Sequence, residues 1–496
     1  MFTLLLFGFT AFLSTASAHN VPLLQRTLAA HGVAAVFPTD PQYNNVTQAH
    51  NQRFKVLPIA VAFPTSVKQV SAAVVAGAAQ KLRVVARSGG HSYIANGLGG
   101  RNGALVVDLS KLKQITVRPS NNTALIETGN RLGDVALALN AHGRAMPHGS
   151  CSYVGVGGHT GYGGWGYSSR NWGLALDVIR SATVVLANGT IASASATVNP
   201  DLFWAIRGAS PSFGIVTSIE VQTFPAPPSV TLFEYLWTLP AQSASHALTS
   251  FQTFVLTDIP KELGATLLLT AGPTKGSINF AFTGAWYDGD AALLNSTLAP
   301  YLEGMPSVEP VLYLPGSFID SVAMLATPMP LDTSSGPDQQ DTFYVKSLMT
   351  PDGAPMSNAS ITAFVSYLAN EGFDSDTNWF VLAELYGGKN SAVNAVPLDS
   401  TAFAKRDTLF TFRFGASSLS GSPPYPNDGF SFLDGMVGSI LDNEPAHWGF
   451  GAYLNYLDER LANGAKLYYG SHYDRLKSLK AAFDPHDTFN FPVGIS

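Results

Sequence analysis

Two short stretches of the chain hold residue types that could carry chemistry. One, at positions 87–93, turns through two adjacent glycines into His91. The other, at positions 151–159, begins with Cys151, the only cysteine among 496 residues, and continues into a glycine-dense run. Glycine has no Cβ, so its backbone can approach a flat or charged ligand and offer N–H groups to it. Taken singly, His91 would be a structural loop residue and Cys151 a small buried hydrophobe. Taken together, they indicate a ligand site.

These stretches resemble the two flavin attachment points of the vanillyl-alcohol-oxidase-like flavoproteins, in the berberine-bridge-enzyme branch. Within that branch the likeness is to the fungal glucooligosaccharide oxidases, and it extends from about Phe54 to Pro492. In this family a loop histidine bonds the flavin 8α carbon, and a cysteine sulfur bonds carbon 6. The resemblance therefore implies FAD that is covalently bound through His91 and Cys151.

The resemblance also implies that the glycine-rich stretches and their neighbours contact the cofactor. The implied contacts are Arg87, Ser88, Gly89, Gly90, Ser92, Val154, Gly157, Gly158, His159, Gly161, Val216 and Asn490. Val154 matches a position where a small side chain in relatives leaves room for oxygen, with an ordinary core valine as the alternative. Asn490 lies in the segment 487–492, which resembles the C-terminal flavin-side signature of the family. A Rossmann site is not favoured, because the glycines do not form a clean G-x-G-x-x-G between a strand and a helix.

For the chemistry, the resemblance implies that Tyr456 is the base that takes the proton of a substrate hydroxyl while hydride leaves for the flavin N5. Tyrosine has an ordinary pKa of about 10, so a base of this type needs a partner. Glu384 falls where the family carries an aspartate that is hydrogen-bonded to this tyrosine. It lies in an apolar, aromatic stretch, where an unpaired charge would be costly to bury. The alternative for Tyr456 is a core aromatic, as for most of the 18 tyrosines.

The substrate side departs further from the family. Leu268 and Leu382 stand where the oligosaccharide oxidases carry polar residues, and Arg413 replaces a glutamine. The planar guanidinium of Arg413 could bind a carboxylate or a polar ring substituent, with a salt bridge inside the domain as the alternative. Candidates for stacking against sugar faces are Tyr93, Trp379 and Tyr386. The residues for the oxidation chemistry therefore match the family better than the residues that would select the substrate.

Several features predict a secreted protein. Residues 1–18 have the apolar core and the small-residue cleavage site of a signal peptide. No later segment has the unbroken apolar length of a membrane helix. Five Asn-x-Ser/Thr sequons are potential glycosylation sites, namely Asn45, Asn121, Asn188, Asn295 and Asn358. A secreted chain with one cysteine can form no internal disulfide, and a bond to the flavin would account for the lone thiol.

Length and patterning predict an α+β protein, and the resemblance implies the two-domain FAD-binding fold of the vanillyl-alcohol-oxidase type. A chain of 496 residues exceeds one ordinary core, so two domains are expected. Strands and helices alternate up to a proline-rich segment at 224–228, and the long strands beyond it favour an antiparallel substrate-domain sheet covered by helices. The expected division is a signal peptide at 1–18, an FAD-binding domain at 19–225, a substrate-binding domain at 226–454 and a C-terminal return to the FAD-binding domain at 455–496.

Local signals place individual elements. Ser66, before apolar residues at helical spacing, predicts a helix start, and Asn188-Gly189 predicts a tight hairpin turn. Further strands are expected at 83–86, 104–109, 124–127, 231–239, 266–270, 278–287, 379–386 and 409–414, and helices at 132–141, 243–255 and 473–483.

The favoured hypothesis is a secreted FAD oxidase of the anomeric C1 hydroxyl of mono- or oligosaccharides, which yields a lactone and hydrogen peroxide. Two alternatives stay open: an oxidase or dehydrogenase of a small alcohol or secondary metabolite, and a non-catalytic flavin-bearing sugar-binding protein. The leucines at 268 and 382 keep the first open, while Tyr456 and Glu384 argue against the second. The expected partners are the sugar substrate and molecular oxygen. We expect a monomer without a metal or a membrane partner, and the net charge of −6 without a basic run does not favour nucleic acid.

Overall fold

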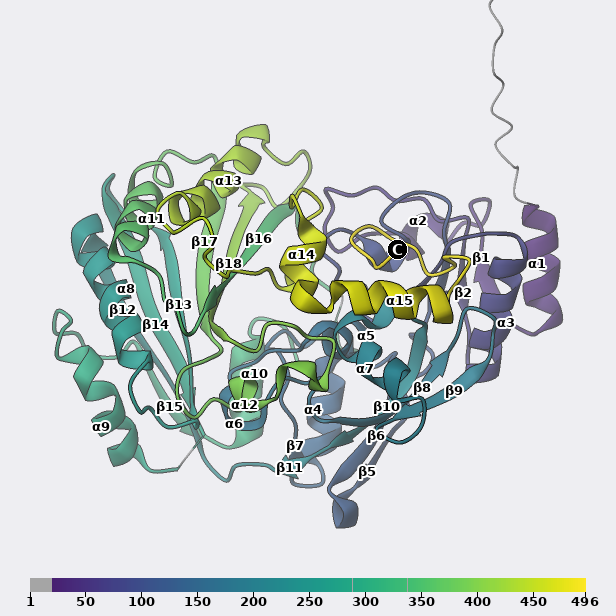
Figure 1. Cartoon of the computed structure of the whole chain (residues 1–496), viewed down its shortest axis with the longest axis horizontal. Coiled ribbons are helices and arrows are strands. Elements are labelled where there is room, and N and C mark those ends of the chain that lie inside the picture. The colour runs from purple at the N-terminus through teal and green to yellow at the C-terminus, as the bar shows by residue number, and fades with distance from the viewer. Residues whose placement is uncertain (1–19, 288, 337) are drawn as a thin grey trace, which may run out of the picture.

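The computed structural model describes residues 20–287, 289–336 and 338–496, and the expected signal peptide lies outside them. The molecule is α+β and has two lobes (Figure 1). One lobe contains a four-stranded and a five-stranded sheet, and the other contains a seven-stranded antiparallel sheet. The two-domain α+β architecture expected from the sequence is therefore confirmed.

The four-stranded sheet leads the chain into the first of the two stretches. Its order is β1 (Ala34–Val36), β2 (Ala60–Phe63), β4 (Leu105–Asp108) and β3 (Val84–Arg87), and the last three strands are parallel. The helices of this region are α1 (Val21–Ala30), α2 (Tyr43–Val46) and α3 (Val67–Ala79). The α3 helix begins where predicted, because the Ser66 side chain accepts a hydrogen bond from the Gln69 N–H. Directly after β3 comes the turn that carries His91.

The five-stranded sheet is antiparallel. Its order is β5 (Ile115–Arg118), β6 (Thr123–Glu127), β10 (Ile215–Gln222), β8 (Ile179–Val185) and β9 (Ile191–Ser195). The predicted hairpin joins β8 to β9, and Gly189 in its turn has φ +83°, which favours glycine. The helices here are α4 (Leu132–Asn140), α5 (Val156–Tyr162), α6 (Ser169–Trp172) and α7 (Pro200–Ala209). The short strands β7 (Arg144–Ala145) and β11 (Phe224–Pro225) pair, and our proposed boundary after residue 225 falls at the end of β11.

The seven-stranded sheet forms the second lobe. Its order is β15 (Leu312–Gly316), β12 (Val230–Pro240), β14 (Ser277–Trp286), β13 (Leu263–Ala271), β17 (Thr377–Leu385), β18 (Thr408–Ser418) and β16 (Phe343–Pro351). Two of these strands, β15 and β16, are absent from the expectation based on sequence. Every residue of β16 is buried, so this strand lacks the alternation that marks a half-exposed strand. Three helices, α8 (Ala241–Val255), α11 (Asn358–Asn370) and α13 (Asn427–Leu441), cover one face of the sheet.

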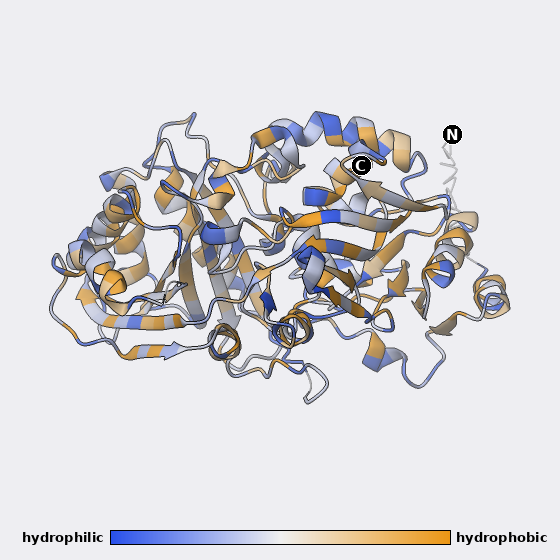
Figure 2. Ribbon diagram, turned by 90° about the horizontal axis from the view of Figure 1, so that it is seen from below, coloured by the Kyte–Doolittle hydropathy of each residue, from blue (hydrophilic) through white to orange (hydrophobic). Residues whose placement is uncertain are grey.

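The alternation of side chains along the strands separates a core face from a cleft face. On β17, Val381 and Ala383 join the hydrophobic core under the three covering helices. Phe380, Leu382 and Glu384 alternate with them and line the cleft between the lobes. Figure 2 shows hydrophobic residues recurring along the strands and helices of both lobes. Three more helices occur in this part of the chain, α9 (Ala291–Leu302), α10 (Phe318–Ala326) and α12 (Ala392–Ala395), and α12 packs against α6 of the first lobe.

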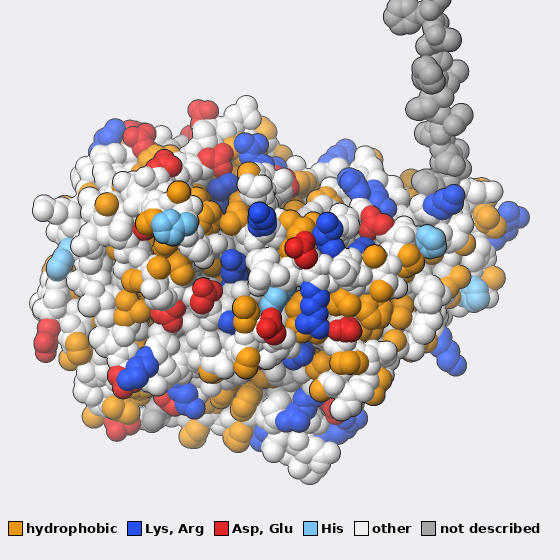
Figure 3. Space-filling model, in the orientation of Figure 1, with side chains coloured by type: hydrophobic (Ala, Val, Ile, Leu, Met, Phe, Trp, Pro, Cys, Tyr) orange, Lys and Arg blue, Asp and Glu red, His pale blue; other side chains and the backbone are white. Residues whose placement is uncertain are grey.

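The C-terminal segment returns to the first lobe. It contains α14 (Gly464–Tyr469) and α15 (Tyr473–Phe483), drawn in yellow in Figure 1. The Val84 N–H of β3 bonds the Thr488 carbonyl at 2.8 Å, and the Asn96 side chain bonds the Pro492 carbonyl at 3.0 Å. Acidic and basic side chains are interspersed on the face seen in Figure 3. No helix in the described part of the chain combines the length and the hydrophobicity needed to span a membrane.

Candidate active site

A cleft of about 800 Å³ lies between the two lobes, and both stretches singled out from the sequence line it. After β3 the chain turns through Gly90, which has φ +80°. Within the described residues, the backbone N–H groups of positions 89–92 donate no hydrogen bond. Adjacent free N–H groups beside a cleft form a binding place for an anionic or strongly polar group.

The two stretches meet through backbone contact. A Cβ on Gly89 would lie 2.3 Å from the Gly155 nitrogen, and a Cβ on Gly155 would lie 2.0 Å from the Gly89 nitrogen. Only glycine at both positions permits so close an approach. This contact brings His91 and Cys151, sixty residues apart in sequence, to the same cleft.

His91 is held by residues from distant parts of the chain. Its Nε2 bonds the Asp338 carboxylate at 2.8 Å, and the His50 ring stacks on it with centroids 4.0 Å apart. Burial, with the added effect of His91, lowers the pKa of His50 to about 4. Burial favours protonated Asp338, but the His91 hydrogen bond and Arg131 outweigh it, so the pKa of Asp338 is lowered. With Nε2 engaged, Nδ1 is the ring nitrogen of His91 that is left for another bond.

The same cluster has donors for a metal ion. His50, His91 and Asp338 each offer one ligand atom, and these atoms lie within 4.8 Å of one another. The two rings are stacked with an interplanar angle of 25°, so their in-plane lone pairs run side by side and do not converge on one point. The arrangement therefore favours orientation of His91 over coordination of a metal.

Cys151 is half-buried at the cleft and begins a turn in which the Val154 N–H bonds its carbonyl at 3.3 Å. Burial raises the pKa of the Cys151 thiol. The Leu132 N–H bonds the Val154 carbonyl at 2.9 Å and so attaches this turn to the start of α4. Val154 itself is half-buried and lines the cleft.

Most of the residues expected to contact the cofactor line the cleft. They are Arg87, Ser88, Gly89, Gly90, Ser92, Val154, Gly157, Gly158, His159 and Val216, together with His91 and Cys151. Some of them also hold the walls in place. The Arg87 guanidinium bonds Asp108 of β4, and His159 Nε2 accepts a hydrogen bond from the Gly149 N–H at 3.0 Å. Burial lowers the pKa of His159 to about 3, which keeps this acceptor neutral.

Two of the expected cofactor contacts, Gly161 and Asn490, do not line the cleft. A Cβ on Gly161 would lie 2.8 Å from the Ser210 Cβ, so this glycine serves the packing of α5. The Asn490 side chain bonds Arg101 at the exposed side of the C-terminal segment. The next residue, Phe491, lines the cleft instead.

Tyr456 and Glu384 meet in this cleft. The Tyr456 hydroxyl donates a 2.5 Å hydrogen bond to Glu384 Oε1. Burial raises the pKa of Glu384 to about 7, although the Tyr456 hydrogen bond and Arg413 oppose it. Burial, followed by the charge of Glu384, raises the pKa of Tyr456 well above its ordinary value. Tyr456 therefore keeps its proton at neutral pH unless Glu384 takes it, so the two side chains form one proton-accepting unit.

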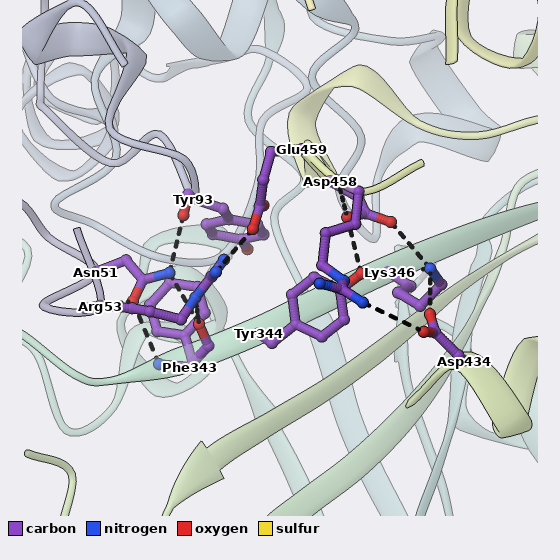
Figure 4. Close-up of polar contacts among 10 residues, drawn as sticks. Asn51, Arg53, Tyr93, Phe343, Tyr344, Lys346, Asp434, Asp458 and Glu459 are labelled. Carbon is purple, nitrogen blue, oxygen red and sulfur yellow. Dashed lines mark hydrogen bonds and ion pairs between the residues drawn. The ribbon is translucent and has the colours of Figure 1, made fainter. Parts of the chain in front are cut away.

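The turn that carries Tyr456 is anchored to the sheet. Asp458, two residues later, is buried and accepts hydrogen bonds from Tyr344 at 2.8 Å and from Lys346 at 3.0 Å (Figure 4). Both donors lie on β16, at the edge of the seven-stranded sheet. These bonds hold the turn so that the Tyr456 hydroxyl reaches Glu384 on β17.

Two of the expected substrate contacts, Tyr93 and Arg413, line the cleft, as does Leu382. The Tyr93 ring lies nearly parallel to the Tyr456 ring, with centroids 5.9 Å apart and an interplanar angle of 7°. The Asn51 side chain bonds the Tyr93 carbonyl at 2.8 Å (Figure 4). Tyr93 is thus placed next to the proton-accepting pair.

The expectation that Trp379 and Tyr386 stack against sugar is wrong, because neither lines the cleft. Trp379 is five residues from Glu384 on β17, and alternation turns it to the opposite face. There it joins the core, and its Nε1 bonds the Gly372 carbonyl at 2.8 Å. Tyr386 is fully buried beyond the end of β17 and stacks on Trp165.

Sequence reasoning misses His50 and Asp338, and it assigns no role to Asp458. His50 and Asp338 lie 41 and 247 residues from His91 and carry no local signal. Asp458 could have been found from the sequence, because it follows Tyr456 by two residues in an N-Y-x-D motif.

Two protein-family models match this chain, one in its N-terminal part and one at its C-terminal end. A family model described as an FAD binding domain matches residues 58–195, and one described as berberine and berberine like matches residues 452–496. The xylooligosaccharide oxidase of Thermothelomyces thermophilus is 37% identical over 461 residues, which cover 90% of this chain and 88% of that protein. A solved structure of xylooligosaccharide oxidase from Myceliophthora thermophila C1 in complex with xylobiose has a TM-score of 0.89 at 34% identity, covering 96% of this chain and 99% of that one.

A structure of glucooligosaccharide oxidase from Acremonium strictum has a TM-score of 0.88 at 32% identity, with 96% and 99% of the two chains covered. That protein is described as having a 6-S-cysteinyl, 8α-N1-histidyl FAD. The fold and the cleft thus define a two-domain FAD-binding oxidoreductase. The chain belongs to the berberine-bridge-enzyme-like family of FAD-linked oligosaccharide oxidases, as the resemblance predicted. The free N–H groups of residues 89–92, and the open space around Gly158, fit a flat, phosphate-bearing cofactor.

Proposed function

We propose that the protein is a secreted FAD-dependent oxidase of the anomeric C1 hydroxyl of mono- or oligosaccharides. The observation that carries the proposal is the hydrogen bond between Tyr456 and Glu384 in the cleft that His91 and Cys151 also line. When bound, FAD supplies the hydride acceptor, and molecular oxygen takes the electrons on to hydrogen peroxide. Loss of the C1 hydride and the hydroxyl proton leaves a carbonyl at C1, so the sugar product is a lactone.

Tyr456 and Glu384 accept the hydroxyl proton together. The Tyr456 oxygen takes the proton of the C1 hydroxyl while its own proton passes along the 2.5 Å hydrogen bond to Glu384. This relay needs no free tyrosinate, which burial disfavours. Glu384 must be ionised at the start, and its pKa of about 7 makes the ionised form available from neutral pH upward.

We also propose that FAD is bound covalently through both His91 and Cys151. Asp338 engages Nε2 of His91, which leaves Nδ1 for the bond to the cofactor. The cysteinyl, histidyl FAD of the Acremonium strictum relative supports the same pair of bonds here. The other cleft-lining residues of the two stretches would then contact the cofactor, and Val154 would leave room beside it for oxygen.

Secretion and glycosylation belong to the same proposal, as does a monomeric state. All five sequon asparagines, Asn45, Asn121, Asn188, Asn295 and Asn358, are exposed and thus accessible to a glycosyl transferase. A secreted enzyme also meets the oligosaccharides that extracellular polymers release.

A small alcohol or secondary metabolite is the second candidate substrate. Leu382 lines the cleft, and Leu268 is its partner across the β13–β17 register. These two side chains offer no hydrogen bond to sugar hydroxyls. The proton-accepting pair of Tyr456 and Glu384 serves either substrate class.

The test is anaerobic mixing of the flavin-loaded protein with cello-, chito-, xylo- and malto-oligosaccharides, read by bleaching of the flavin absorbance. The matched control for each sugar is its borohydride-reduced alditol, which lacks the anomeric hydroxyl. We expect bleaching by at least one sugar and none by its alditol. Equal bleaching by the alditol would contradict oxidation at C1, and bleaching by small alcohols alone would favour the second candidate.

A further inference from the structure

Arg413 carries a charge in the cleft that the proton relay does not use. It lies in the middle of β18 and is half-buried on the cleft-facing side. Among the described residues it makes no hydrogen bond and no ion pair, and its Nε is fully buried without a partner. A salt bridge inside the domain, the alternative drawn from the sequence, is therefore wrong.

The rings nearest to the Arg413 guanidinium come from three aromatic residues, and its partner across the β16–β18 register is Ser347. Its guanidinium carbon lies 5.0 Å from the centre of the Phe380 ring, 5.3 Å from that of Tyr456 and 5.5 Å from that of Tyr93. Leu382 is its partner across the β17–β18 register. Aromatic rings attract a cation through their faces, but they do not accept the in-plane hydrogen bonds that a guanidinium offers.

Glu384 does not supply the missing partner. It acts on Arg413 through its charge, yet it makes no ion pair with it. Its Oε1 accepts the Tyr456 hydrogen bond, and its Oε2 is buried without a partner. The Nε of Arg413 is thus a buried donor without an acceptor, which is costly, and the cost is removed when the acceptor arrives with a ligand.

We infer that the substrate carries a carboxylate on the sugar ring that is oxidised, and that Arg413 binds this carboxylate. The inference rests on the proposed function and specifies its sugar as one with a uronic acid at the reducing end. A carboxylate has two in-plane oxygens that match the guanidinium fork. The ring whose C1 hydroxyl contacts Tyr456 must also pass Arg413, since the guanidinium carbon is 5.3 Å from the centre of the Tyr456 ring.

The first test uses two disaccharides that differ only in their carboxylates, digalacturonate and the α-1,4-linked galactobiose. Each is mixed anaerobically with the flavin-loaded native protein and with Arg413→Gln, and flavin bleaching is followed over substrate concentration. We expect the native protein to favour the acid. The ratio of the two second-order rate constants should fall by about 10- to 100-fold in Arg413→Gln, the range for a hydrogen-bonded charge.

Arg413→Lys is the matched variant, because it keeps the charge and loses the planar fork. Its ratio should lie between those of the native protein and Arg413→Gln. A native preference for galactobiose would overturn the inference. An equal ratio of the two rate constants in the native protein and in Arg413→Gln would also overturn the inference. Such a result would mean that Arg413 acts on Tyr456 or on the cofactor and not on the carboxylate.

The second test does not depend on oxidation. Methyl galacturonoside and methyl galactoside have a blocked C1, and their binding is followed by the perturbation of the flavin spectrum. If the native protein binds the acid and Arg413→Gln does not, the inference is supported, even when no sugar bleaches the flavin. Absence of bleaching would count against the proposed function alone. Bleaching by neutral sugars without binding of the acid overturns the inference and leaves the proposed function standing.

The third test measures Tm without sugar. Arg413→Met keeps a long side chain and removes the unpaired charge, so we expect Tm to rise. A fall in Tm would mean that the guanidinium stabilises the fold, and it would contradict a side chain reserved for a ligand.

Discussion

The Tyr456 hydroxyl bonds Glu384 at 2.5 Å, although the two residues are 72 positions apart and lie on separate elements. Tyr456 belongs to a short turn at 454–456, and Glu384 lies near the end of β17. Burial raises the pKa of both groups. In the proposed mechanism this hydrogen bond lets Tyr456 pass its proton to Glu384, so that the two side chains act as one proton acceptor.

Tyr456→Phe removes only the hydroxyl, so the fold and the cofactor should be retained. We expect the rate of flavin reduction by sugar to fall by about 10²- to 10⁴-fold, the usual cost of losing a positioned base. Anaerobic stopped-flow measures this rate directly. Tyr313→Phe, at an exposed tyrosine of β15, is the control and should behave like the native protein. Near-native reduction by Tyr456→Phe would mean that another group takes the proton.

The pH dependence of flavin reduction should follow Glu384. Its pKa of about 7 means that it is protonated, and unable to accept a proton, on the acid side. The rate should therefore rise with pH, by about tenfold per pH unit well below 7, and level off above 7. Flavin reduction in Glu384→Gln should be slow at every pH, and its rate should not rise with pH in this range. A native profile that is flat from pH 5 to 8 would contradict the relay.

The same ionisation affects stability. The folded pKa of Glu384, about 7, lies above the ordinary value of 4.5 that applies to the unfolded chain. Ionisation therefore costs the folded state stability as the pH rises from 4.5 through 7. The gain in Tm of Glu384→Gln over the native protein should be larger at pH 8 than at pH 5.

FAD should be attached at two residues. Acid-precipitated protein should stay yellow, and His91→Ala and Cys151→Ala should each retain one covalent linkage. Peptide mass spectrometry assigns the modified residue in each variant. An unmodified Cys151 peptide from active native protein would disprove the double attachment.

Asp338→Asn should impair the linkage at His91. The amide loses the charge that orients the ring through the 2.8 Å bond to Nε2. We expect a smaller fraction of histidyl-linked FAD, with the linkage to Cys151 retained, as measured on the two peptides. Asp332→Asn is the control, because that exposed carboxylate bonds Ser334 on the same loop. Complete histidyl linkage in Asp338→Asn would exclude the orienting role.

Val154→Leu should slow reoxidation by oxygen. Val154 lines the cleft three residues after Cys151, and a longer side chain there would begin to fill the space proposed for oxygen. Reduction by sugar should change much less. Stopped-flow traces of the two half-reactions decide this. If reduced native protein persists in air but is quickly reoxidised by a quinone, oxygen is not the acceptor.

The sequence by itself determined the features that depend on neighbouring residues. Ser66 caps α3, Gly189 forms the β8–β9 turn, and the glycines around His91 and Cys151 make close backbone approach possible. These follow from local φ, hydrogen-bonding and steric preferences, which a few consecutive residues decide. The family resemblance, and not these local preferences, is what named His91, Cys151 and most of the cleft-lining residues before any fold was known.

Only the tertiary structure decided which partners these residues have. Asp338 reaches His91 across 247 residues, and no local pattern encodes such a contact. Which face of β17 meets the helices is decided by the packing of the sheet, and once Glu384 faces the cleft, strand alternation places Trp379 in the core. The missing acceptor of Arg413 likewise depends on which residues the other strands place around it. The chemistry of a side chain is local, whereas its burial and its partners depend on the whole fold.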